Sequence, residues 1–232
     1  MSKNDPLCIR FGDGYKCPAC KSQELIKNGK TPTGKQRYGC KICGKRFITD
    51  YTYKAYHSSV NHQIIQFTKE GLGIRSTARV LQISTTTLLK RIVSIASNIM
   101  KPPIAKGKTY EVDEMRTYIG KKKRLRWIVY ALDRESKSVV DFNVGRRTNN
   151  TLKHVIHSLE LSQARKIYTD KLKNYRYLIN KNIHHTQVYC TNNIERNNLT
   201  IRTHLKRLNR KTICYSRSLV LLSAILKIYF WN

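Results

Sequence analysis

Four of the seven cysteines stand in an order that can hold a metal ion. Cys17 and Cys20 form one C-x2-C pair, Cys40 and Cys43 form a second, and nineteen residues separate the pairs. This spacing is typical of a zinc ribbon, in which each pair sits on a tight turn and two turns complete a tetrahedron of sulfurs. Four thiolates leave no open coordination position, so we expect one structural Zn²⁺ per chain.

The alternative for these cysteines is two disulfides or free thiols. The first residues show no apolar core of a secretory signal, which argues against disulfides. Three further cysteines have no ligand spacing and are interpreted as ordinary thiols: Cys8, Cys190 and Cys214. Basic and aromatic residues of the ribbon are interpreted either as nucleic-acid contacts or as ordinary surface: Arg37, Tyr38, Lys45, Arg46 and Phe47.

Acidic residues are the second group that could do chemistry, because they are few. From residue 161 to 232 only Asp170 and Glu195 are acidic, among 14 Lys and Arg. Asp170 follows a predicted strand, Glu195 begins a predicted helix, and Asp113 lies in an earlier predicted strand. Three such carboxylates could hold two divalent cations for phosphoryl transfer.

Each acid also has a simpler interpretation. Glu195 could be a helix-start carboxylate paired with Arg202, seven residues later on the same face, and Asp170 could be an ordinary loop residue. Within the first strand, alternation puts Glu111 on the face of Asp113 and Glu114 on the opposite face. Glu111 is therefore the reserve candidate.

The charge of the chain points to a polyanionic partner. Lys and Arg number 45 and Asp and Glu 14, a formal net charge of +31 that is spread over the whole chain rather than gathered in a tail. This balance favours nucleic-acid binding over a ribosome-associated or nonspecifically basic protein. No apolar run of about 18 residues occurs, so we expect no membrane span.

Helical periodicity begins after the ribbon and predicts a helix-turn-helix. A first helix ends near Gly71, a second runs from 74 to 81, and a third runs from 85 to about 96, capped by Ser84. The third helix would present four residues to the DNA major groove: Thr86, Thr87, Lys90 and Arg91. The alternative is a helical hairpin that serves only in packing.

The C-terminal half predicts an α/β domain. Strands are expected at 109–119, 125–132, 139–144, 166–169 and 183–189, with turns at 120–124 and 133–137. Helices are expected at 148–161, 192–208 and 216–231. This order is compatible with a ribonuclease H-like fold.

The chain also resembles the transposases of the insertion sequence one family over nearly its whole length. The resemblance is carried by CPAC, NGKTPTGKQRYGCKIC, GLGIRSTARVLQIS, VDEMRTYIG, RLRWIVYALDR, VVDFNVGRRTNNTL, IYTD and NNIERNNLTIRTHLKRL. It implies a DDE transposase whose triad is Asp113 in VDE, Asp170 in YTD and Glu195 in IER. Arg202 and His204 match the basic positions that follow the glutamate.

The chain departs from the family pattern at two places. Lys171-Leu172 follows Asp170 where Gly-Trp is expected, and Asn197 stands where His is expected. Neither departure removes a triad carboxylate. The ribbon and the triad lie in one continuous chain, whereas the family commonly joins two reading frames.

We therefore expect a multidomain α+β and α/β chain. The predicted boundaries are a zinc ribbon at 1–56, a helix-turn-helix at 57–97, a linker at 98–108 and a ribonuclease H-like catalytic domain at 109–232. The predicted enzyme cleaves double-stranded DNA at element ends and transfers the strands to target DNA, using two Mg²⁺ or Mn²⁺ ions. It would act as at least a dimer, in the cytoplasm and at the nucleoid of a prokaryote. The alternatives are a non-catalytic DNA-binding regulator and a metal-dependent nuclease that does not join strands.

Overall fold

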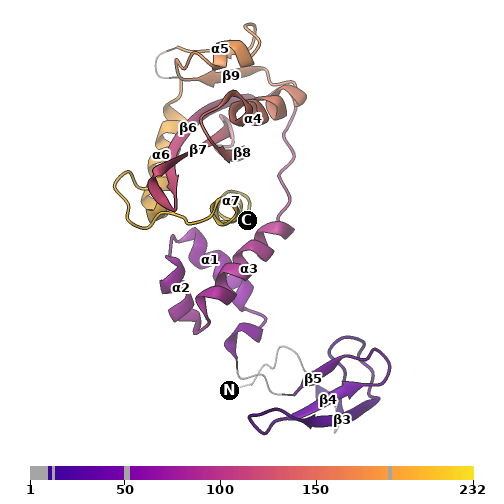
Figure 1. Ribbon diagram of the computed structural model, residues 1–232. Coiled ribbons are helices and arrows are strands. Elements are labelled where there is room, and N and C mark those ends of the chain that lie inside the picture. The colour runs from indigo at the N-terminus through magenta and orange to yellow at the C-terminus, as the bar shows by residue number, and fades with distance from the viewer. Residues whose placement is uncertain (1–9, 12–13, 50–52, 188–189) are drawn as a thin grey trace.

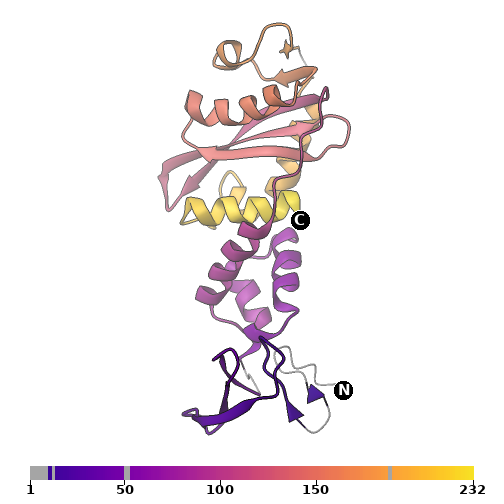
Figure 2. The same cartoon turned by 90° about the vertical axis from the view of Figure 1, so that its right-hand side faces the viewer.

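The computed structural model describes residues 10–11, 14–49, 53–187 and 190–232. Three parts follow one another along the molecule: a small β structure, a group of helices and a larger sheet covered by helices (Figure 1). The 90° view in Figure 2 shows the same order. In the described part of the chain, no helix is long and apolar enough to cross a membrane.

The N-terminal part is a small ribbon built around two cysteine turns. Its strands are β1 (Arg10–Phe11), β2 (Gly14–Tyr15), β3 (Leu25–Lys30), β4 (Gln36–Cys40) and β5 (Arg46–Ile48). Strands β3, β4 and β5 form an antiparallel sheet in that order. Among the described residues of this part, the buried core is Cys17, Cys40 and Phe47, with Leu25 and Tyr38 packed against it, so Phe47 is a packing residue and not surface. Cys8 lies outside the described residues.

The middle part contains the predicted three helices. They are α1 (Val60–Lys69), α2 (Ile74–Leu81) and α3 (Thr85–Asn98), preceded by the short 3-10 helix η1 (Lys54–Tyr56). The turn after α2 takes a left-handed residue at Gln82, with φ 51°, where glycine would be the unstrained choice. The Ser84 hydroxyl then accepts a hydrogen bond from the Thr87 amide and starts α3, as the sequence predicts.

The C-terminal part is a mixed five-stranded sheet in the order β10-β9-β6-β7-β8. Its strands are β6 (Thr109–Ile119), β7 (Lys121–Asp133), β8 (Val139–Gly145), β9 (Lys166–Thr169) and β10 (His184–His185). Strands β6, β7 and β8 form an antiparallel meander, β9 runs parallel to β6, and β10 runs parallel to β9. Three antiparallel strands followed by two parallel ones beside the first is the ribonuclease H-like arrangement.

Helices cover both faces of this sheet, as Figure 2 shows for α4 and α7. The helices are α4 (Asn149–Leu161), α5 (Tyr175–Leu178), α6 (Asn192–His204) and α7 (Leu219–Trp231), with the 3-10 helix η2 (Lys206–Leu208) after α6. Alternation in β6 explains how both faces find a core. Tyr110 and Val112 pack in the core that contains α4, whereas Met115 packs in the core that contains α6 and α7.

Several predicted boundaries in this part are wrong. Residues 121–124, expected in a turn, begin β7, because Gly120 with φ 72° reverses the chain by itself. The strand expected at 183–189 is only His184–His185 among the described residues. The helix expected at 192–208 breaks after His204, and the last helix begins at Leu219 rather than 216.

The helix-turn-helix and the sheet share one hydrophobic core. Helix α7 lies between them, in contact with α1 and α3 on one side and β8 on the other (Figure 1). Buried residues of the helix-turn-helix, of α7 and of the sheet belong to one cluster, among them Leu88, Ile92, Leu222 and Ile228. A Cβ at Gly71 would overlap the backbone carbonyl of His204, so these two segments touch directly.

Candidate functional site

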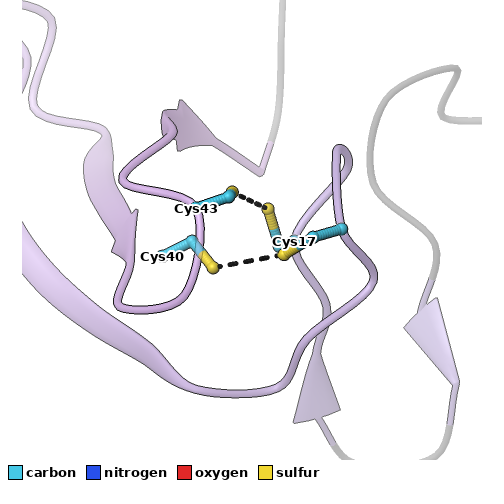
Figure 3. A group of neighbouring side chains, drawn as sticks. Cys17, Cys40 and Cys43 are labelled. Atoms are coloured by element: carbon cyan, nitrogen blue, oxygen red, sulfur yellow. Dashed lines mark hydrogen bonds between the residues drawn. The ribbon is translucent and has the colours of Figure 1, made fainter.

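The four predicted zinc ligands converge on one point. The Sγ atoms of Cys17 and Cys43 lie 3.5 Å apart, as do those of Cys20 and Cys40 (Figure 3). All four sulfurs lie within 4.8 Å of one another. Sulfurs at about 2.3 Å from a tetrahedral zinc ion would be about 3.8 Å apart, so the four cysteines fit a structural Zn²⁺.

Two matching turns aim these sulfurs. In each turn the residue after the second cysteine has a left-handed backbone, Lys21 with φ 61° and Gly44 with φ 69°. The Lys21 amide donates to the Cys17 carbonyl, and the Gly44 amide donates to the Cys40 carbonyl. Burial raises the pKa of the Cys17 thiol, but amides of Cys20 and Ala19 and the neighbouring thiols lower that pKa to about 6. This environment favours the thiolate of Cys17. The Ser22 amide lowers the pKa of the Cys20 thiol, but burial and the neighbouring thiols raise that pKa to about 12. A bound Zn²⁺ would deprotonate both thiols.

A cluster of three carboxylates lies where β9 ends beside β6. We call Asp113, Glu114 and Asp170 the acidic cluster; their ligand oxygens lie within 4.8 Å of one another. The position follows from the register, because Thr169, the last residue of β9, pairs with Val112. Asp170 therefore emerges beside Asp113. Hard carboxylate oxygens at this separation are a ligand set for Mg²⁺ or Mn²⁺.

Hydrogen bonds hold Asp113 in place. Asn198 of α6 donates to its Oδ2 at 2.6 Å, and the Glu114 amide donates to its Oδ1 at 2.7 Å. The Tyr130 hydroxyl in turn donates to Asn198 Oδ1 at 2.9 Å. Burial raises the pKa of Asp113, with smaller contributions from the charges of Asp170 and Glu195. A bound cation would offset both effects.

Glu114 is the member of the acidic cluster that the sequence prediction missed. As alternation predicts, the Glu114 side chain faces away from Asp113, toward Tyr175 and Arg147. The Nη2 atom of Arg147 lies 3.9 Å from Glu114 Oε2. Burial, followed by the charge of Asp170, raises the pKa of Glu114 to about 7. Glu114 directly follows Asp113, and β9 ends before the position that would pair with Glu114. The adjacent acid and the end of β9 together could have indicated this ligand.

Glu195 lies on α6, the helix whose Asn198 donates to Asp113. It lies exposed in the first turn of the helix and accepts a hydrogen bond from the Thr191 hydroxyl at 3.0 Å. Its charge raises the pKa of Asp113, which puts it within electrostatic reach of the cluster. It is not one of the three carboxylates within 4.8 Å.

Arg202 does not pair with Glu195 in the described part of the chain. Its Nε is buried without a hydrogen-bond partner among the described residues. Burial lowers the pKa of this guanidinium, and so does the neighbouring Arg210, whereas the charge of Asp113 raises it. A half-buried guanidinium with an unpaired Nε can receive an anion.

Two other predicted positions have structural partners instead. Glu111 is fully buried and accepts hydrogen bonds from Asn193 and from the Ile194 amide, and it forms an ion pair with Arg134 at 3.3 Å. The reserve candidate thus fastens β6 to the start of α6. His204 bonds through Nδ1 to the Tyr229 hydroxyl of α7 at 2.7 Å, and the two rings meet edge to face.

The four residues predicted to face DNA divide into two pairs. Thr86 and Lys90 are exposed on α3. The Thr87 hydroxyl bonds with Tyr53 and Ser84. Arg91 donates to Asn61 Oδ1 at 2.7 Å and to the Ala55 carbonyl, so it fastens α3 to α1 and to η1.

A ribonuclease H-like sheet with carboxylates at the junction of its first and fourth strands defines an enzyme of phosphodiester chemistry. The ribbon and the helix-turn-helix attached to it define a DNA-binding protein.

Known protein families match all three parts. A family model described as IS1 transposase matches residues 108–231, one described as InsA N-terminal domain matches 15–44, and one described as InsA C-terminal domain matches 51–95. The chain belongs to the IS1 transposase family, and it is a DDE-type transposase with a zinc ribbon and a helix-turn-helix.

Two InsB proteins agree with this assignment. The insertion element iso-IS1n protein InsB of Shigella dysenteriae is 38% identical over 108 residues, which cover 47% of this chain and 82% of that protein. The insertion element IS1 protein InsB of Shigella flexneri is 37% identical over 111 residues, covering 48% and 85%. A simian T-cell lymphotropic virus intasome structure aligns with a TM-score of 0.40 at 17% identity, over 73% of this chain and 67% of that chain.

Proposed function

We propose that this transposase cleaves DNA at the ends of its insertion element and joins those ends to target DNA, using Asp113, Asp170 and Glu195 as ligands for two Mg²⁺ or Mn²⁺ ions. The observation that carries the proposal is the acidic cluster at the end of β9, with Glu195 of α6 within electrostatic reach. Bound cations would supply charge neutralisation and activation of the attacking oxygen. Glu114 is a further candidate ligand.

The chemistry would take two steps of the same kind. In the first, a water oxygen attacks the scissile phosphorus, and the bond to the 3′ oxygen breaks and leaves a 3′-hydroxyl. In the second, that hydroxyl attacks a target phosphorus, and the target strand breaks at its own P–O bond. Arg202, whose Nε is buried without a partner in the described residues, would hold the phosphate that is attacked. Asn198 would keep Asp113 oriented through both steps.

Removal of one carboxylate charge tests this assignment. Asp113→Asn, Asp170→Asn and Glu195→Gln change side-chain volume little, and each should lower cleavage and joining at least about a thousandfold. DNA binding should persist or strengthen, because each variant is one charge more positive. Glu195→Gln protein that joins strands near the parent rate would remove Glu195 from the site. Cleavage without joining by the parent would instead favour the metal-dependent nuclease, and binding without either activity would favour the regulator.

For DNA recognition, we propose that α3 enters the major groove with Thr86 and Lys90. Lys90→Ala should weaken binding to element-end DNA and leave the thermal unfolding midpoint unchanged, because the side chain is exposed. Arg91→Ala is the matched comparison: it should lower the unfolding midpoint, because it removes bonds to Asn61 and Ala55. Lys90→Ala protein that binds end DNA like the parent at every salt concentration would exclude α3 as the reader.

We also propose the domain boundaries given by the sequence, namely 1–56, 57–97, 98–108 and 109–232. Two element ends must be brought together, so the protein would act as at least a dimer. As a DNA transposase of a prokaryote, it would work at the nucleoid in the cytoplasm. Sedimentation with and without end DNA measures the oligomer.

A further inference from the structure

A basic cavity lies outside the acidic cluster, at the amino ends of β6 and β9. It has a volume of about 620 Å³ and is lined by five cations: Lys106, Lys108, Arg134, Arg165 and Lys166. Glu135 is the one acid in its lining and is paired with Lys108. In the described part of the chain, the side chains of Lys106, Arg165 and Lys166 have neither a hydrogen bond nor an ion pair. Three uncompensated cations around one cavity favour an anionic ligand.

The cavity lies on the same two strands as Asp113 and Asp170, and by alternation Tyr168 faces the same side as Asp170. Tyr168 lines the cavity and pairs with Glu111, and Asp170 emerges two residues further along, beside Asp113. Two residues of strand span about 7 Å. Along the helix axis, each strand of DNA rises about 3.4 Å per nucleotide. With that axis along β6 and β9, about two nucleotides span the interval between the cavity wall and the acids.

One cation of the cavity is tied to the helix that carries Glu195. Arg134 stacks on the Tyr168 ring, with its guanidinium carbon 4.4 Å from the ring centroid, and pairs with Glu111. Glu111 also accepts from the Ile194 amide in the first turn of α6. An anion in the cavity would therefore be held by the same framework that positions Glu195.

We propose that this cavity binds backbone phosphates of the DNA strand being cleaved, about two nucleotides from the scissile phosphate. The inference rests on the proposed function, because it takes the acidic cluster as the place of cleavage. Its ligand is a phosphodiester backbone, since the uncompensated lining groups are three positive charges around one cavity and the negative charges of DNA lie on its phosphates.

The test combines a triple variant with DNA of graded length. Lys106→Ala, Arg165→Ala and Lys166→Ala are made together in the full zinc-loaded chain. Lys121→Ala, Lys122→Ala and Lys123→Ala, exposed residues at the start of β7, form the control with the same loss of charge. Circular dichroism confirms folding. Binding is measured in chelator, so it does not depend on cleavage, and cleavage is measured with Mg²⁺. The DNA is element-end duplex, shortened stepwise from either side of the cleavage point.

The cavity variant should bind long DNA at least tenfold more weakly than the control triple at low salt. Its slope of log affinity against log salt should be shallower than that of the parent by about 2. On DNA shortened by a few nucleotides on one side, parent and cavity variant should bind alike. Cavity variant that binds long DNA like the control triple, or a deficit that does not depend on DNA length, would overturn the proposal.

A second arm separates DNA from free phosphate compounds. If inorganic phosphate at a few millimolar binds the parent but not the cavity variant, and long element-end DNA does not displace it, the cavity is a small-anion site and the proposal is wrong. A parent that shows the length-dependent binding but does not cleave would refute the proposed function alone, because the binding arm stands without it.

Discussion

The two metal sites of this transposase are built in opposite ways. The cysteine site lies on turns of a ribbon whose buried core is Cys17, Cys40 and Phe47, so the ligands themselves form most of that core. The acidic cluster lies at a strand junction of a sheet with a large core on each face. The first site needs its metal in order to fold. The second is assembled by a fold that already exists, and its buried carboxylates destabilise that fold until a cation binds.

This difference also separates structural from catalytic chemistry. Four thiolates close the coordination sphere of zinc and leave no place for a substrate. Three carboxylates, one of them exposed, leave room for phosphate oxygens around a hard cation. Three predictions test the contrast, in order of expected size.

Loss of zinc should unfold the ribbon alone. Zinc binding in small zinc domains contributes roughly 10 kcal/mol or more to folding, which exceeds what a three-residue core supplies. Cys40→Ser should therefore reduce zinc below one per chain and make residues of the ribbon sensitive to protease, while the helices and sheet keep their melting transition. Cys214→Ser, at an exposed cysteine outside the site, is the control and should keep one zinc. Cys40→Ser protein with full zinc and an intact ribbon would contradict the contrast.

Loss of a zinc ligand should destabilise the ribbon, whereas neutralising Glu114 should stabilise the metal-free protein. The pKa of Glu114 is raised to about 7 in the folded chain, from an ordinary value of 4.5. The folded chain thus holds this proton more tightly than the unfolded chain, and stability is lost as pH rises from about 4.5 to 7. Glu114→Gln should gain about 2–3 kcal/mol in the free energy of unfolding at pH 8, and little near pH 4.5.

Urea denaturation in chelator measures this gain, and it should shrink when Mg²⁺ is added to the parent. Equal stability of Glu114→Gln and parent at pH 8 would show that the charge of Glu114 does not destabilise the metal-free fold.

Removing the support of Asp113 should affect activity more than folding. Asn198→Ala deletes the donor to Asp113 Oδ2, and supporting groups of this kind are worth about tenfold or more in metal affinity or activity. The Mg²⁺ concentration for half-maximal cleavage should rise by about that factor. Asn197→Ala, beside it and 3.4 Å from the Tyr130 hydroxyl, should change it much less. A lower maximal rate at unchanged Mg²⁺ dependence would mean that Asn198 does not act through the metal.

The sequence predicts the cysteine site fully because all of its information is local. Two short motifs carry the ligands and the turns, and the left-handed position after Cys43 is occupied by glycine. The acidic cluster is predicted only in part. Alternation puts Glu114 on the face of β6 opposite to Asp113, which predicts that the two acids stay apart. However, β9 ends at Thr169, and beyond this end side chains from both faces of β6 can meet. The length of a neighbouring strand is not visible in the pattern of β6 itself.

Other differences have the same origin in tertiary context. The periodicity of the sequence predicts α3 but cannot show that Arg91 holds α1 and η1. Charge finds the exposed lysines after Gly120 but assigns them to a turn, because four cations in a row have low strand propensity. These residues nevertheless begin β7, where Lys121 pairs with Ile119 of β6 before the register shifts to Leu125 and Tyr118.

Helix α7 fixes the distance between the helix-turn-helix and the five-stranded sheet. It packs against α3 on one side and β8 on the other, and its buried residues belong to a core shared by both. Under the proposed function, the helix that would read a DNA sequence and the sheet that would carry the catalytic acids are thereby held at one separation and one rotation. The number of base pairs between the recognised sequence and the cut would then be set by this one hydrophobic interface rather than by the DNA.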